Sequence, residues 1–161
     1  MSVVADTSSL NYLLLLGHVD LLPAIYGEVV IPQTVMRELA HPRTADVVRR
    51  WVAAPPTWLE LATVTRPIPD MGLHAGERDT IAPALERGIE RVLLDDRRAR
   101  MVASSLGLRV SGLLGVLDTA VARKWINLRL VLRELLGTSF RCRPELIREL
   151  LDRQERRERE K

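Results

Sequence analysis

Several residue types are scarce in this sequence, and each scarcity argues against a class of protein. The chain of 161 residues has one cysteine, Cys142, which rules out an internal disulfide and fits a reducing compartment. Its three histidines show no metal-ligand spacing with one another or with Cys142, which argues against a zinc site. One Phe, two Tyr and three Trp are too few for a sheet of aromatic rings that stacks single-stranded nucleic acid. Any nucleic acid should therefore bind through its phosphates.

Motifs of other classes are also missing. There is no glycine-rich phosphate loop and no serine in a nucleophile elbow, and Gly112–Asp118 matches a dinucleotide fingerprint poorly. The apolar run Tyr12–Leu16 is too short to span a bilayer and lacks the preceding basic residues of a signal peptide. We therefore expect a cytoplasmic protein.

The composition is that of a folded protein, because 47% of the residues are hydrophobic and 28% are charged. We expect a single domain over residues 1–151 and a charged tail over residues 152–161. The tail has nearly balanced charge and no apolar stripe, so it should be a frayed, solvated helix end. A net charge of +3 is compatible with a polyanionic partner but is weak support for one.

Apolar runs alternate with helical patterns along the chain, which predicts an α/β fold with a mostly parallel central sheet and helices on both faces. Pro83 should kink the helix that contains it, and Gly88 should end that helix. The expected strands are Ser2–Ala5, Glu28–Ile31, Trp58–Val64, Arg91–Leu94 and Leu108–Ser111. The expected helices are Leu10–Leu22, Pro32 to about His41, Ala45–Ala54 capped by Thr44, Gly76–Arg87, Arg97–Leu106, Leu113–Lys124, Leu128–Leu136 and one that starts at Pro144.

Acidic residues recur where these strands end or helices begin. Asp6 follows the first strand, Glu38 lies in the helix after the second, Glu77 opens a later helix, and Asp95 and Asp96 follow the fourth strand. Ligands of an open parallel sheet bind beyond the carboxyl ends of its strands, where such carboxylates would converge. They repel one another unless protons or cations neutralise them, and hard oxygen ligands suit Mg²⁺ or Mn²⁺.

Each acid also has an ordinary structural explanation. Asp6 is as well explained as a helix N-cap, and Glu38 alone is better explained as a solvated helix residue. The helix dipole accounts for Glu77. One of the two adjacent aspartates can cap the next helix. The joint pattern is more informative than any single position.

With these segments in place, the chain resembles a PIN-domain ribonuclease, the fold of the VapC-type toxins, and most closely a PIN subgroup long of unknown function. The segments that carry the resemblance extend through about Leu151 and are VVADTSSL, HVDLLPAIYGEVVIPQTVMREL, GERDTIAPALERG, VLLDDRRARMVASSLGLRVSGLLGVL and FRCRPELIRELL. The resemblance implies a three-layer fold and hydrolysis of RNA with one or two Mg²⁺ or Mn²⁺ ions. It also implies a homodimer and, if the toxin analogy holds, a small antitoxin partner.

The resemblance assigns roles to individual residues. Asp6, Glu38, Glu77 and Asp96 match the family's catalytic acids, with Asp96 favoured over Asp95 for the fourth metal ligand. Thr7 and Ser8 match the polar pair that positions water or phosphate. Arg97, Arg98 and Arg100 begin a helix beside the site and would bind flanking phosphates; the alternative is that they form an ordinary solvated face.

Two departures and two alternatives remain open. His74 stands where relatives often have an acid, and Pro83 interrupts a helix that is normally rich in alanine and leucine. A catalytically weak PIN-like scaffold that binds a protein partner is the main alternative, supported by the extra leucines of Leu10–Leu22. A receiver-like phosphoacceptor would need a lysine at a late strand end, and Lys124 and Lys161 are not there.

Overall fold

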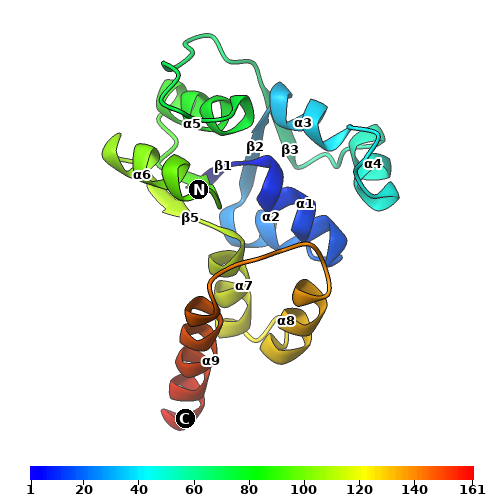
Figure 1. Ribbon diagram of the computed structural model, residues 1–161, viewed down its shortest axis with the longest axis vertical. Coiled ribbons are helices and arrows are strands. Elements are labelled where there is room, and N and C mark those ends of the chain that lie inside the picture. Colours follow the sequence, from blue (N-terminus) through cyan, green and yellow to red (C-terminus); the bar gives the residue numbers. More distant parts are fainter. The chain divides into compact units, whose positions relative to one another are not determined.

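The computed structural model describes residues 1–161, and a five-stranded parallel sheet organises its first part (Figure 1). The strands are β1 (Ser2–Ala5), β2 (Glu28–Pro32), β3 (Leu59–Ala62), β4 (Arg91–Leu93) and β5 (Arg109–Ser111). Their order in the sheet is β3-β2-β1-β4-β5, with every neighbouring pair parallel. All five strands lie within or next to the runs that predict them.

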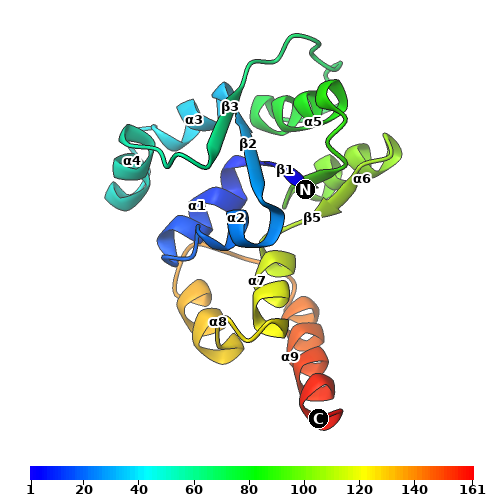
Figure 2. The ribbon, with the colours of Figure 1, turned by 180° about the vertical axis from the view of Figure 1, so that it is seen from behind.

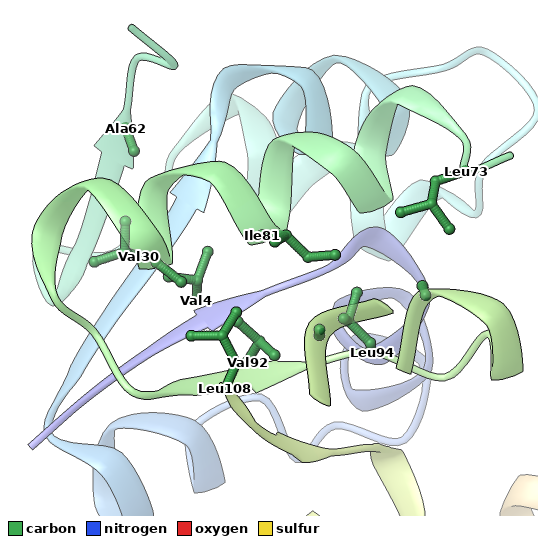
Figure 3. Close-up of a cluster of buried hydrophobic side chains, with 11 residues drawn as sticks. Val4, Val30, Ala62, Leu73, Ile81, Val92, Leu94 and Leu108 are labelled. Atoms are coloured by element: carbon green, nitrogen blue, oxygen red, sulfur yellow. The ribbon is translucent and has the colours of Figure 1, made fainter. Parts of the chain in front are cut away.

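One face of the sheet carries a row of valines beneath a helix. Val4 of β1 is in register with both Val30 of β2 and Val92 of β4, and all three are buried. Figure 3 shows Ile81 of α5 (Ala75–Arg87) beside this row, in the same apolar cluster. Since neighbouring side chains of a strand point to opposite faces, β1, which is apolar and buried from Val3 to Ala5, has side chains to bury on both sides.

Helices cover both faces of the sheet, as the sequence predicts. α5 contacts β1, β2 and β4, whereas α2 contacts β2 beside α1 (Figure 2). The result is the expected three-layer α/β fold. The helices of this part are α1 (Thr7–Leu15), α2 (Leu21–Tyr26), α3 (Gln33–Leu39), α4 (Asp46–Ala53), α5 and α6 (Arg97–Ser105). α5 continues through the buried Pro83, and Gly88 ends it in the left-handed conformation as predicted.

The prediction of a single helix over Leu10–Leu22 is wrong. α1 ends at Leu15 and α2 begins only at Leu21, because Gly17 between them adopts a φ of 72°, a conformation that ends a helix. α1 also begins earlier than expected, since the side chain of Asp6 caps it by accepting from the N–H of Ser9.

The prediction that Thr44 caps α4 is also wrong. The hydroxyl of Thr44 donates back to the carbonyl oxygens of Leu39 and His41, each at 2.8 Å. α4 instead starts after Ala45, which offers no side-chain cap. Thr44 thus stabilises the end of α3 and the following turn.

Residues 1–113 and 114–161 form two compact units. The second contains most of α7 (Leu113–Ala122), α8 (Leu128–Leu136) and α9 (Pro144–Arg159), with a small apolar cluster around Leu132 and Leu150. α9 does not fray after Leu151: it stays helical to Arg159, and Arg153 and Arg157 both ion-pair with the buried Asp118. None of the helices combines the length and the apolar character needed to cross a membrane.

Candidate functional site

The strand order creates a topological switch point between β1 and β4. From β1 the chain passes to β2 on one side, whereas β4 pairs with the other side of β1. Open parallel sheets bind ligands beyond the carboxyl ends of strands at such a point. Asp6 follows β1 directly, and Asp95 and Asp96 follow β4 after one residue.

Asp6 and Asp95 are linked at this switch point by hydrogen bonds. The backbone N–H of Asp95 donates to Asp6 Oδ2 over 3.4 Å. Ser9 joins the two acids, because its backbone N–H donates to Asp6 Oδ1 and its hydroxyl donates to Asp95 Oδ2, both at 3.0 Å. The N–H of Leu113 donates to Asp95 Oδ1 at 3.0 Å. Both oxygens of each carboxylate therefore accept a hydrogen bond.

This pair of acids resists ionisation. Asp6 is only 5% exposed, and burial, followed by the nearby charge of Asp95, raises the pKa of Asp6 from 3.8 to about 7. Burial also raises the pKa of Asp95, against the hydrogen bonds from Leu113 and Ser9. A cation placed beside the pair would favour the charged forms and so lower the pKa of both carboxyl groups.

Glu38 comes from α3 and not from a strand end. The hydroxyl of Thr7, at the start of α1, donates a short hydrogen bond to Glu38 Oε2. On its other side the carboxylate lies against Gly76 of α5, where an added Cβ would come within 2.6 Å of Oε2. Glu38 is therefore held between the first turns of two helices.

Glu77 completes a second group of acids. Its carboxylate accepts from the backbone N–H of His74 at 3.0 Å, which supports the start of α5. Burial raises the pKa of Glu77, and the charges of Asp96 and Glu38 raise it further, although the hydrogen bond from His74 opposes them. Glu38 and Asp96 are thus both close enough to Glu77 to oppose its ionisation.

Asp96 is the exposed acid of the site. Its Oδ1 caps α6 by accepting from the N–H of Ala99 at 2.9 Å, and its Oδ2 makes no hydrogen bond. Two of the arginines expected to meet phosphate are engaged elsewhere: Arg98 Nε donates to the carbonyl of Met71 and Arg100 Nη1 to that of Leu94. Arg97 is exposed in the first turn of α6.

The structure thus brings the predicted acids together in two groups, Asp6 with Asp95 and Glu38 with Glu77 and Asp96. No three His, Cys, Asp or Glu side chains come close enough to ligate one ion in this arrangement. The donor set itself consists of carboxylate oxygens only, the ligand type that Mg²⁺ or Mn²⁺ prefers. The residues therefore fit such an ion in type.

Sequence reasoning missed Ser9, which contacts Asp95 where Ser8 had been expected to serve the site. A signal was available, since the third residue after a capping aspartate is the one whose N–H that aspartate accepts. It also missed Gly112, whose close approach to Asp95 has no local sequence signal, whereas Gly76 after a proline-rich loop does predict a close approach of the backbone.

These features define an open α/β protein with a ligand site at the switch point of its sheet, lined by carboxylates of the type that hard divalent cations prefer. Residues 2–156 match a protein family described as PIN domain, and the chain belongs to this family. No curated protein and no solved structure matches the sequence. PIN domains are generally nucleases and typically use divalent metals, which supports a hydrolase at that level.

Proposed function

We propose that this protein is a metal-dependent endoribonuclease that hydrolyses RNA phosphodiesters. Asp6, Glu38, Glu77 and Asp96 are the proposed catalytic acids and, together with Asp95, the proposed holders of one or two Mg²⁺ or Mn²⁺ ions. The observation that carries the proposal is the buried Asp6, whose pKa is raised to about 7 beside Asp95 in a chain of the PIN family.

The side chains of the site have different proposed roles. Asp95 uses both oxygens to hold Ser9 and Leu113, so it anchors the loop after β4, whereas Asp96 has a free oxygen and is the better fourth ligand. Thr7 orients Glu38 by its hydrogen bond. A bound ion of this kind polarises a phosphodiester and lowers the pKa of water, so no side chain needs to act as a covalent nucleophile. Arg97 is exposed where it can meet a flanking phosphate.

A catalytically weak scaffold that binds a protein partner is the second candidate. It is favoured by the separation of the acids, since no three of them lie within reach of one ion. Titration with Mn²⁺ separates the two candidates. Binding that depends on Asp6 and Asp96 supports the enzyme, and the absence of binding supports the scaffold. A role as the toxin of a toxin–antitoxin pair, with a small antitoxin and a homodimer, belongs to the same proposal.

The decisive experiment is cleavage of a panel of structured RNAs with Mn²⁺ and with EDTA. The wild-type chain should cleave only with the metal, and Asp6→Asn should abolish cleavage while leaving the circular dichroism spectrum unchanged. Asp46→Asn is the matched control, because the Asp46 side chain is 78% exposed on α4 and should not matter. Undiminished cleavage by Asp6→Asn would sink the proposal.

A further inference from the structure

Gly76 occupies a position that does not need glycine for its backbone. It is the second residue of α5, and its φ lies outside the positive range that Gly72 and Gly88 adopt. Alanine is more favourable than glycine within a helix, because glycine loses more backbone freedom on folding. The reason for glycine at this position must therefore be space.

The space is taken by the carboxylate of Glu38. A Cβ added to Gly76 would lie 2.6 Å from Glu38 Oε2, 2.7 Å from Oε1 and 3.0 Å from Cδ. All three distances are shorter than ordinary contacts, so an alanine and this carboxylate cannot coexist as they stand. The short hydrogen bond from Thr7 reaches the same carboxylate at Oε2.

We propose that Gly76 is a positioning residue for the acidic site: its bare Cα is the surface against which the Glu38 carboxylate lies. Together with the Thr7 hydroxyl it fixes where this acid is presented. The proposal rests on the proposed metal-dependent nuclease in so far as Glu38 is one of the metal-holding acids.

Gly112 makes an informative contrast. A Cβ there would lie 2.5 Å from Asp95 Oδ1 and 3.3 Å from the carbonyl oxygen of Leu94. Asp95 is short, and both of its oxygens already accept hydrogen bonds, so it cannot move without losing them. Glu38 has a longer side chain that can swing away. Gly112→Ala should therefore destabilise the fold, whereas Gly76→Ala should chiefly displace a carboxylate.

The first measurement is Mn²⁺ affinity by calorimetry on the full chain. Gly76→Ala should weaken binding by about 10- to 100-fold, the usual effect of removing a group that orients a ligand, without lowering the urea unfolding midpoint. Gly137→Ala is the matched control, since Gly137 has a φ of −77° and its added Cβ would lie 3.3 Å from the carbonyl of Glu134, away from any carboxylate. If the wild-type chain binds Mn²⁺ and Gly76→Ala binds it with the same affinity, the positioning role is overturned.

A stability cycle tests the contact without relying on metal. In a Glu38→Ala background the added Cβ meets no carboxylate, so Gly76→Ala should raise the unfolding midpoint through helix propensity. In the wild-type background the same substitution should raise it less or not at all. Equal increases in both backgrounds overturn the proposal. If the wild-type chain binds no Mn²⁺ yet the two increases differ, the proposed nuclease fails and the contact between Gly76 and Glu38 stands.

Discussion

The charge state of Asp6 offers a direct test of the site, and Asp6→Asn is the perturbation that isolates it. Asparagine caps a helix about as well as aspartate, and its carbonyl oxygen can still accept from the N–H of Ser9. The substitution therefore removes the titrating group while it keeps the start of α1. Its amide N–H₂ would face the N–H of Asp95, so the informative quantity is the pH dependence of stability and not its absolute value.

The sign follows from the direction of the pKa shift. In the folded chain the pKa of Asp6 is raised from 3.8 to about 7, chiefly by burial and next by the charge of Asp95. Well below pH 3.8 both the folded and the unfolded chain carry the proton, and Asp6 costs no stability. As pH rises toward 7 the unfolded chain loses the proton first, so the free energy of unfolding falls. At roughly 1.4 kcal/mol per pH unit the loss is about 4 kcal/mol, and it is constant above that window.

The assay is urea unfolding in EDTA at several values from about pH 4 to about pH 8. The free energy of unfolding of wild type minus that of Asp6→Asn should fall by about 4 kcal/mol across the window. Burial of Asp95 and Glu77 acts in the same direction, so the variant should retain some pH dependence. Asp46→Asn, on an exposed side chain, should follow the wild type. Parallel curves for wild type and Asp6→Asn would refute the burial of a proton at this site.

Two further substitutions probe contacts that the structure shows. Thr7→Val removes the hydroxyl that donates to Glu38, and should weaken Mn²⁺ binding about tenfold by calorimetry while Thr7→Ser does not; equal affinity for both variants would contradict the orienting role. Asp118→Asn weakens the ion pairs to Arg153 and Arg157, and should cost about 1 kcal/mol and speed amide exchange in the last two turns of α9. Burial raises the pKa of Asp118, but the hydrogen bonds from the two arginines outweigh burial, and the pKa is lowered overall. The stability that the ion pairs contribute is therefore lost as pH falls through this lowered pKa. Unchanged amide exchange would show that α9 does not depend on these pairs.

Most of the fold follows from local patterns in the sequence. The three central strands, β1, β2 and β4, contain short buried apolar runs, and burial of such runs on two faces leaves few arrangements other than a parallel sheet. The errors fall where one residue decides between two local outcomes. Gly17 ends a helix that an apolar stripe would continue, and Thr44 turns its hydroxyl back to Leu39 in place of capping α4.

The places of the acids in the fold follow from the sequence, whereas their contacts do not. A strand end fixes where Asp6 and Asp95 stand, since topology alone brings those ends together. The groups that hold them cannot be read from spacing: Ser9 bonds to Asp95 across 86 positions, and Thr7 bonds to Glu38 across 31. Only the packed helices bring these atoms into reach.

Helix capping and metal binding are not competing explanations for Asp6 and Asp96. A cap must stand at the junction of a strand and a helix with its carboxylate beside free N–H groups, and both acids cap the helix that follows them. In a parallel sheet the same junctions form the edge where ligands bind. The N–H groups favour the charged carboxylate, whereas burial and neighbouring acids oppose it, and for Asp6 burial prevails. A divalent cation would reverse that balance, so metal binding and the loss of a proton from Asp6 should be one linked event.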